Sequence, residues 1–156
     1  MFASAAFALT LALQAAPTGA VDPASPEGAA VLTPVNAIFS ALAARDGSAI
    51  LPHIDTAGRI TVIAEGPNGA RRSDSPSWTE FTAGLTPGPE RLEEVLIDPT
   101  IAIDGDIAVV WGRYVFRVDG AISHCGVDHF DLVRKDGVWK IVNLTWTQRE
   151  TGCDSL

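Results

Sequence analysis

The segment SHCGVDHFDLVRKDG, residues 123–137, gathers side chains that could act as acids, bases or metal ligands. They are His124, Cys125, Asp128, His129 and Asp131. The segment alternates like a β-strand, so successive side chains point to opposite faces of a sheet. His124 and Asp128 then share one face, and the other three lie on the opposite face. This division predicts no metal site, and it separates His124 from Asp128 by roughly 13 Å along the strand.

The strands that position these side chains are indicated by three Asp-Gly pairs at matched spacing, at 104–105, 119–120 and 136–137. Asp-Gly is favoured in two-residue hairpin turns, whose central residues need positive φ. Three such turns between alternating segments predict a four-stranded antiparallel meander. The expected strands are residues 91–103, 106–118, 121–135 and 138–149.

Counting outward from two-residue turns gives a predicted register. Trp111 then faces Asp128, and Arg113 faces Gly126, which would leave a gap beside the arginine. Across the last hairpin, Asp128 meets Thr145. One face would thus form a pocket with an apolar floor and a polar wall. Its expected ligand-binding residues are Trp111, Arg113, Phe130, Asn143 and Thr145.

Asp128 is the leading candidate for catalysis. A carboxyl group beside Trp111 in a pocket of low dielectric would have a raised pKa and could serve as acid or base. The alternative is a structural carboxylate paired with Arg113. His124 is the second catalytic candidate, either at the pocket mouth or solvated at the rim of the sheet.

The opposite face of the predicted sheet is too apolar to be fully solvated. It would carry Tyr114, Phe116, Val127 and Trp146, with polar residues such as His129 among them. Such a face favours a homodimer interface.

The chain before the meander predicts helices and a short hairpin. Apolar residues at helical spacing from Val31 to Ala43 end at Asp46-Gly47, and a second short helix is expected over about 48–53. The segment GRITVIAEGPNGARRSDS predicts a hairpin, and Ser77 can cap a brief helix. Trp78 and Phe81 on that helix fit either core packing or a cover for the pocket.

Composition bounds the class of protein. The chain has 156 residues, 47% of them hydrophobic, and a net charge of −8. These values describe one globular domain and argue against binding to nucleic acid or to an anionic membrane.

The first 20 residues are apolar and uncharged, as in an export signal, and the alternative is a buried N-terminal helix. Thr18-Gly19-Ala20 offers a processing site, and Gln14-Ala15-Ala16 offers a poorer one. No Lys or Arg lies near Met1, where an export signal usually has one, so the start could lie upstream or the segment could stay as an anchor. The expected order is a signal (1–20), a Pro/Ala-rich linker (21–30), a domain (31–150) and a tail (151–156), in a periplasmic or secreted protein.

Export bears on the two cysteines, Cys125 and Cys153. An oxidising compartment permits a disulfide between them, which would pin the C-terminal tail to the sheet. The alternative is two free thiols.

Three segments carry a family resemblance: IFSALAARDGSAI (38–50), IDGDIAVVWGRYVF (103–116) and DHFDLVRKDGVWKIVNLTW (128–146). With their order, they make the chain similar to the nuclear transport factor 2-like superfamily, and in particular to its SnoaL-like small bacterial members. The resemblance covers about residues 30–149. It implies an α+β cone, in which a long curved antiparallel sheet and N-terminal helices enclose a mainly apolar pocket, often in a dimer.

For function, the resemblance implies several possibilities, and we expect no cofactor. We expect an exported protein that binds a small apolar molecule. The alternatives are an acid/base enzyme of the dehydratase, isomerase, cyclase or epoxide hydrolase type using Asp128, and a homodimeric interaction module without ligand. Many relatives have His where this chain has Asn143 and Thr145. Asp98, Arg113 and Asp128 could imitate the Asp-Arg-Asp group of the superfamily's epoxide hydrolases if Pro99 makes a bulge.

Overall fold

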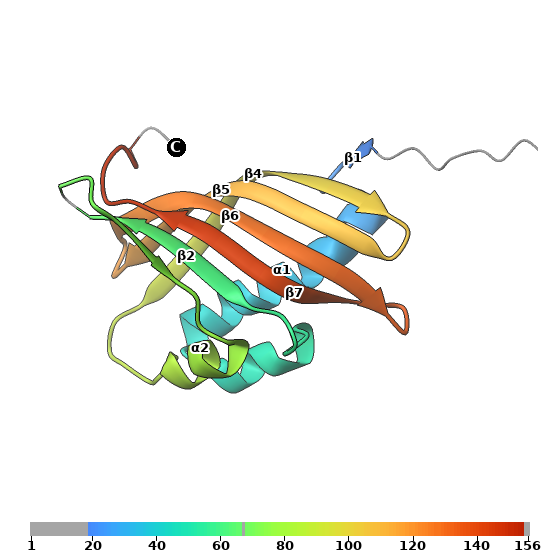
Figure 1. Ribbon diagram of the computed structural model, residues 1–156, viewed down its shortest axis with the longest axis horizontal. Coiled ribbons are helices and arrows are strands. Elements are labelled where there is room, and N and C mark those ends of the chain that lie inside the picture. The colour runs from blue at the N-terminus through green and yellow to red at the C-terminus, as the bar shows by residue number, and fades with distance from the viewer. Residues whose placement is uncertain (1–18, 67, 155–156) are drawn as a thin grey trace, which may run out of the picture.

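The computed structural model describes residues 19–66 and 68–154. A seven-stranded sheet in the order β1-β4-β5-β6-β7-β2-β3 curves around the helices (Figure 1). The helices are α1 (Pro26–Ala44), the 3-10 helix η1 (Gly47–His53) and α2 (Trp78–Gly84). The strands are β1 (Gly19–Val21), β2 (Ile60–Glu65), β3 (Arg71–Asp74), β4 (Leu92–Asp104), β5 (Ile107–Val118), β6 (Ala121–Lys135) and β7 (Val138–Gln148). This is the predicted α+β cone, with the helices packed on one face of the sheet.

The strands β4 to β7 form the predicted meander. Asp119-Gly120 and Asp136-Gly137 make the second and third turns with positive φ at both residues, as expected. In the first turn, Asp104 still pairs with Ile107, so the central residues are Gly105 and Asp106. Only Gly105 has positive φ there, at 57°, because the turn begins on the glycine instead of placing it second. The first strand therefore extends one residue beyond the predicted end.

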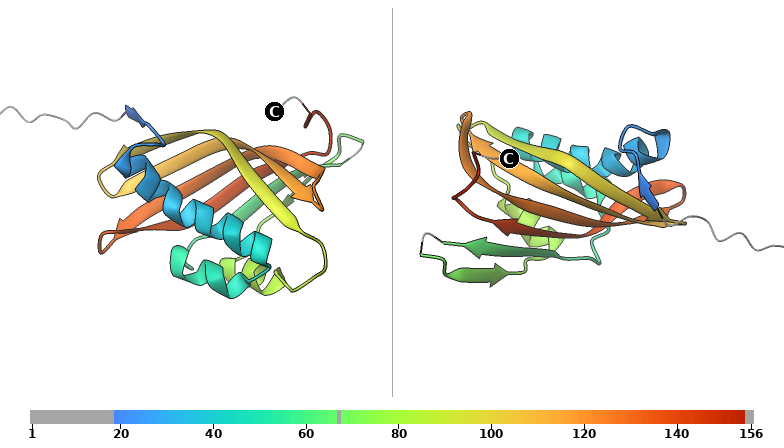
Figure 2. Two further views of the ribbon diagram at one scale, coloured as in Figure 1. Left: turned by 180° about the vertical axis from the view of Figure 1, so that it is seen from behind. Right: turned by 90° about the horizontal axis from the view of Figure 1, so that it is seen from above.

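Three bulges interrupt the regular register of the meander. Between β5 and β6, Arg117 pairs with Ile122 but Phe116 pairs with His124, which leaves Ser123 as an extra residue. Between β6 and β7, Val142 is the extra residue. Between β4 and β5, the irregularity falls at Asp98 and Pro99, where the proline predicts it. A bulge bends and twists the bulged strand, in keeping with the strongly curved sheet seen in Figure 2.

Helix α1 lies across the concave face of the sheet (Figure 2). It begins at Pro26, inside the segment expected to be linker, because the Ser25 hydroxyl accepts from the Gly28 N–H and proline suits the first turn. Among the described helices, α1 is long and apolar enough to cross a membrane. Its residues Val31, Val35 and Ile38 are buried in the core.

Helix α2 forms the other end of the helical layer. Ser77 and Glu80 form a capping box at its start, as the position of Ser77 predicts. Strand β2 runs parallel to β7 and pairs with β3 as the predicted hairpin. The Trp78 indole N–H donates to the Val142 carbonyl oxygen at 2.8 Å, which fixes α2 to β7 at the bulge.

Candidate functional site

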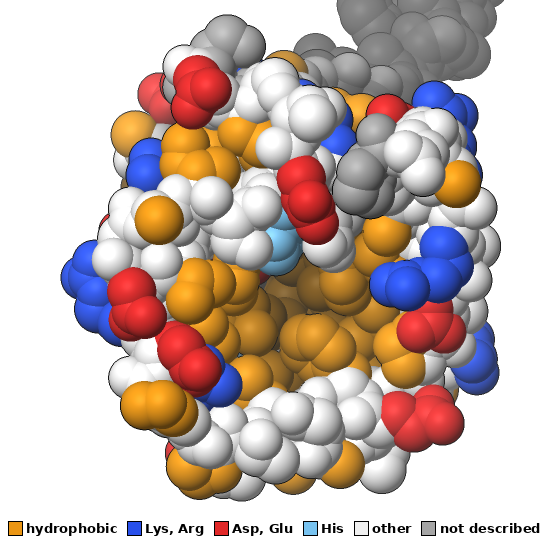
Figure 3. Space-filling model, turned by 90° about the vertical axis from the view of Figure 1, so that its left-hand side faces the viewer, with side chains coloured by type: hydrophobic (Ala, Val, Ile, Leu, Met, Phe, Trp, Pro, Cys, Tyr) orange, Lys and Arg blue, Asp and Glu red, His pale blue; other side chains and the backbone are white. Residues whose placement is uncertain are grey.

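A partly open cavity of about 190 Å³ lies between the concave face of the sheet and the helices α1 and α2. Figure 3 shows a hollow at one end of the molecule lined mainly by hydrophobic side chains. Its polar lining is Glu94, Tyr114, His124, Asp128 and Gln148. The apolar lining comes from Ile38, Phe39, Leu42, Phe81, Phe116, Leu144 and Trp146.

The two bulges that follow Phe116 and Asp131 decide which residues line this cavity. Past Ser123, Asp128 pairs with Gly112, and past Val142 it pairs with Trp146. Each bulge shifts the register by one residue, and a one-residue shift moves a strand's side chains to the other face. The predicted partners of Asp128, Trp111 and Thr145, are therefore wrong for these positions.

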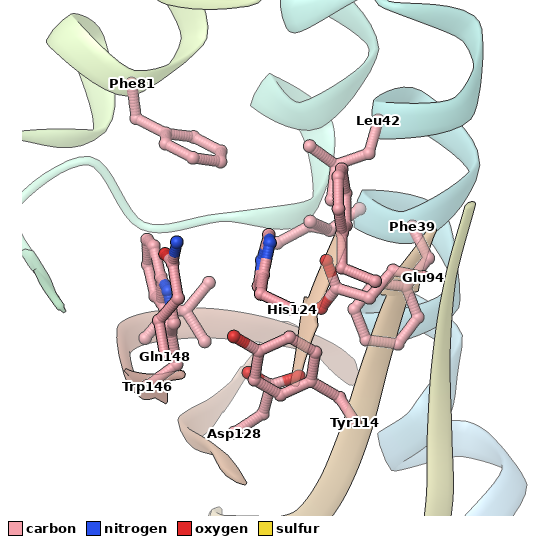
Figure 4. Close-up of a pocket in the computed structure, with 12 residues that line it drawn as sticks. Phe39, Leu42, Phe81, Glu94, Tyr114, His124, Asp128, Trp146 and Gln148 are labelled. Carbon is pink, nitrogen blue, oxygen red and sulfur yellow. The ribbon is translucent and has the colours of Figure 1, made fainter. Parts of the chain in front are cut away.

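Glu94 and Asp128 form a pair of carboxyl groups in the cavity wall, in which Asp128 is buried and Glu94 is partly exposed. Figure 4 shows both groups with the Tyr114 ring on the same side of the pocket. Asp128 is 2% exposed, and its Oδ2 has no hydrogen-bond partner among the described residues when both carboxyl groups are ionised. A proton on Glu94 supplies one, because the two side chains are within hydrogen-bonding reach.

The electrostatics of the pair follow from its burial. Loss of solvation, and then the Asp128 carboxylate, raise the pKa of Glu94 well above its ordinary value. Loss of solvation raises the pKa of Asp128 to about 7, opposed by the hydrogen bond from Glu94. Two such groups titrate as a unit, so near neutral pH the pair holds a shared proton.

Tyr114 and His124 complete the ionisable lining. The Tyr114 hydroxyl donates to the Thr147 carbonyl oxygen at 3.0 Å, and burial raises the pKa of this phenol. His124 stacks on Phe116 with ring centroids 4.7 Å apart. Burial lowers the pKa of His124, so its imidazole is neutral at pH 7.

Of the residues expected on the pocket face, Asp128 and His124 line the cavity. Phe130 lies on the same face, but it is fully buried in the core, edge-on to Phe39. Trp111 and Arg113 lie on the opposite, outer face. Trp111 is 56% exposed beside His129, with ring centroids 5.8 Å apart.

Asn143 and Thr145 also lie on the outer face. The Asn143 amide donates to Asp131 Oδ2 at 3.2 Å, and its oxygen accepts from the Arg59 N–H at 3.0 Å. Asn143 therefore joins β7 to its neighbours instead of contacting a ligand in the cavity.

The Asp-Arg-Asp arrangement does not form. Arg113 pairs with Asp98 at 3.6 Å on the outer face, and the Asp98 side chain is 87% exposed. Asp128 lies on the other side of the sheet, because the bulges reverse the predicted faces. The epoxide hydrolase geometry is therefore absent from these three residues.

Gly126 does not leave the predicted gap. A Cβ atom there would lie 1.8 Å from the Thr147 carbonyl oxygen, so the backbone of β7 occupies the space. The glycine permits this close approach of the two strands.

The disulfide Cys125–Cys153 is present, as predicted. Arg149 pairs with Cys125 in a short bridge before the tail turns back, so the tail reaches the sulfur atom. The bond lies beside Val115 in a small buried cluster on the outer face, next in sequence to His124.

The sequence prediction missed Glu94, Tyr114, Phe116 and Trp146 as pocket residues. The last three were placed on the opposite face by the regular register. Glu94 carried a usable signal, because it stands in phase with Leu92 and Leu96 on one strand. A carboxyl group in phase with apolar side chains points toward the core.

The described residues contain no group of three or more His, Cys, Asp or Glu side chains that could hold a metal ion. The carboxyl pair can transfer protons and form hydrogen bonds inside an apolar cavity.

The fold is that of nuclear transport factor 2-like proteins, as the sequence predicts. One similar solved structure is such a protein from Cytophaga hutchinsonii, with 16% identity, a TM-score of 0.61, and coverage of 76% of this chain and 95% of that one. Another, from Novosphingobium aromaticivorans, has a cystatin-like fold, 13% identity and a TM-score of 0.60, with coverage of 81% and 84%.

A third similar structure, also from Novosphingobium aromaticivorans, is assigned provisionally as the beta subunit of an aromatic-ring-hydroxylating dioxygenase. It has 15% identity and a TM-score of 0.63, with coverage of 77% of this chain and 87% of that one. No family model and no curated protein matches the chain. At these identities the structures show a shared fold.

Proposed function

We propose that this chain is an exported protein that binds a small, largely apolar molecule in the cavity between the sheet and α1. The observation that carries the proposal is a cavity with aromatic walls and a carboxyl pair. Ligand pockets combine an apolar lining with a few placed polar groups in this way. The volume of about 190 Å³ is below the roughly 300 Å³ at which pockets for drug-sized ligands begin, which favours a compact ligand.

The test is an NMR titration with benzyl alcohol, comparing the wild type with two tryptophan variants. Leu42→Trp fills the cavity from α1, whereas Leu51→Trp is a matched change at a side chain 49% exposed on η1. Binding by the wild type and by Leu51→Trp, with loss in Leu42→Trp, supports the proposal. Equal binding by the wild type and both variants would place the ligand elsewhere.

Acid/base catalysis is a second candidate, because the pKa of Asp128 at about 7 suits a group that gives and takes protons at neutral pH. In the reaction that we propose, the Asp128 carboxylate removes a proton from the carbon atom next to a carbonyl group of the substrate. The Glu94 carboxyl group donates a hydrogen bond to the carbonyl oxygen. Deuterium entry into the methyl group of acetophenone in D₂O measures the step. Asp128→Asn should abolish it while benzyl alcohol still binds, and unchanged exchange in that variant would argue against catalysis by Asp128.

Export is supported by the disulfide, since such bonds persist in oxidising compartments. The expected signal falls mostly outside the described residues, but Gly19 and Ala20 belong to β1 and pair with β4. Processing after Ala20 would remove most of β1, whereas processing after Ala16 would keep it. The intact mass of periplasmic protein, with and without reductant, distinguishes the two sites and checks the disulfide.

The face predicted to form a homodimer interface carries Tyr114, Phe116 and Trp146, which line the cavity. We therefore propose that a homodimer would instead use the outer face of the sheet. Val109 and Trp111 are exposed there on β5, at 39% and 56%. Contiguous exposed apolar side chains favour an interaction surface. A similar fold assigned as a subunit of a larger enzyme is in keeping with such a role.

A further inference from the structure

We infer that the cavity selects an organic cation, a protonated amine on a small apolar body, over neutral or anionic molecules of the same size. The inference rests on the proposed small-molecule binding and names its ligand class. Three features carry it: the charges that the lining can bear, the unpartnered oxygen of Asp128, and the aromatic walls.

The lining can bear negative charge but no fixed positive charge. Among the described residues that line the cavity there is no Lys or Arg. His124 is neutral because burial lowers its pKa, although Glu150 opposes this. Arg149 is close enough to act electrostatically on Tyr114, but its side chain is not part of the lining. An anionic ligand would therefore meet carboxyl groups without a compensating cation.

When Glu94 is ionised, one oxygen atom of the carboxyl pair lacks a hydrogen-bond donor among the described residues. This atom is the buried Asp128 Oδ2, and the partly exposed Glu94 presents the pair to the cavity. An unpaired carboxylate in such surroundings is costly. At low pH the shared proton relieves this cost, and at higher pH an ammonium group can replace the proton. An ammonium group carries both the positive charge and the hydrogen-bond donors that the pair lacks.

The aromatic walls suit the same ligand. Phe39, Phe81 and Trp146 border the cavity together with Tyr114 and Phe116. The faces of aromatic rings attract cations, most strongly where the cation is desolvated. Their apolar surface also accommodates the body of the molecule, so one compact ligand can use both parts of the pocket.

The pH dependence follows from the groups around the pair. With the pKa of Asp128 at about 7, the ionised fraction rises from about a tenth at pH 6 to about nine tenths at pH 8. Affinity for a cation that needs the ionised form then rises by up to about tenfold. From α1 and α2 only apolar side chains face the cavity. The other titratable or charged groups near the pair are Tyr114, His124, Arg149 and Glu150.

The experiment compares benzylamine, benzyl alcohol and benzoate by calorimetry at pH 6 and pH 8. Benzylamine stays protonated across this range, so a change in its affinity reports on the protein. We expect benzylamine to bind at least tenfold more tightly than the alcohol at pH 8, and at least fivefold more tightly at pH 8 than at pH 6. The alcohol should show little change, and benzoate should bind weakest.

Variants identify the groups responsible. Glu94→Gln and Asp128→Asn should lose the preference for benzylamine over benzyl alcohol. Asp98→Asn, on the outer face, is the matched control and should behave as the wild type. The wild-type pH comparison needs no variant, so the inference stays testable if either substitution prevents folding.

Different results would overturn the preference for a cation and the binding of small molecules. If benzyl alcohol binds as well as benzylamine at both pH values, the cation inference is wrong and small-molecule binding stands. If none of the three molecules binds, the proposed function fails and the inference fails with it.

Discussion

The two faces of the meander are built from the same strands but have opposite surroundings. On β5, Val110 is completely buried on the concave face, whereas its neighbours Val109 and Trp111 are exposed on the outer face. On β6, Asp128 and Phe130 face inward, and His129 and Asp131 face outward. Both faces of β5 carry apolar residues, so hydrophobicity alone does not reveal which one is covered. The bulges at Ser123 and Val142 determine which face is covered.

The largest expected effect comes from placing a charge on each face of β5. Val110→Asp buries a carboxylate in the core and should lower the free energy of unfolding by about 4 kcal/mol or prevent folding. Val109→Asp, one residue earlier, should cost at most about 1 kcal/mol. Urea denaturation of both variants measures the difference. If Val109→Asp instead cost more than Val110→Asp, Val109 would be the buried residue. The regular register would then be correct and the assignment of the faces would be wrong.

Removing the disulfide tests the end of the outer face that is covered. Replacing Cys125 and Cys153 together by serine opens a loop with a sequence separation of 28. The expected loss is about 3 kcal/mol, because the unfolded chain regains conformational freedom. Thermal unfolding of the variant, beside oxidised and reduced wild type, checks the value. A variant as stable as the oxidised protein would mean that the bond is not closed in solution.

The carboxyl pair tests the concave face through pH. Raised pKa values mean that the folded protein binds more protons than the unfolded chain between about pH 4 and pH 7, so stability falls as pH rises through this range. For Asp128 alone, a pKa raised from 3.8 to about 7 corresponds to about 4 kcal/mol. In Glu94→Gln and Asp128→Asn, the melting temperature should depend less on pH between 5 and 8. An equally steep dependence in both variants would assign the effect to other groups.

The smallest effect on stability is expected from Trp111→Ser, because more than half of this side chain is already in solvent. The change in the free energy of unfolding should lie within about 0.5 kcal/mol. If the outer face forms a homodimer, the same substitution should shift the molecule toward monomer in analytical ultracentrifugation. A monomeric wild type at high concentration would leave the exposed face without a second copy.

The order of elements and the fold could be predicted from turns, caps and spacing, because these signals are local. The Asp-Gly pairs at 119–120 and 136–137 form the expected turns, and Ser77 caps the expected helix. The disulfide could be predicted from two cysteines and an export-like leader. The faces could not, because register accumulates along a strand and a single extra residue reverses it. The predicted face of Asp128 and His124 is correct, because both lie with Phe130 on one uninterrupted stretch of β6. The residues that pair with them across the bulges were predicted on the wrong face.

The bulge at Val142 also has a consequence for how this sequence tolerates insertions and deletions. Its carbonyl oxygen is the acceptor for Trp78, so the residue that resets the register also anchors α2 beside the cavity. Deleting Val142 would leave an even ladder with β6 in which Asn143 follows Ile141, and Leu144 and Trp146 would keep their places on the concave face, but the anchor would be lost. A substitution at this position keeps the carbonyl oxygen and therefore the anchor of α2. The bulge thus accommodates one extra residue of β7 without exchanging the two faces of the strand.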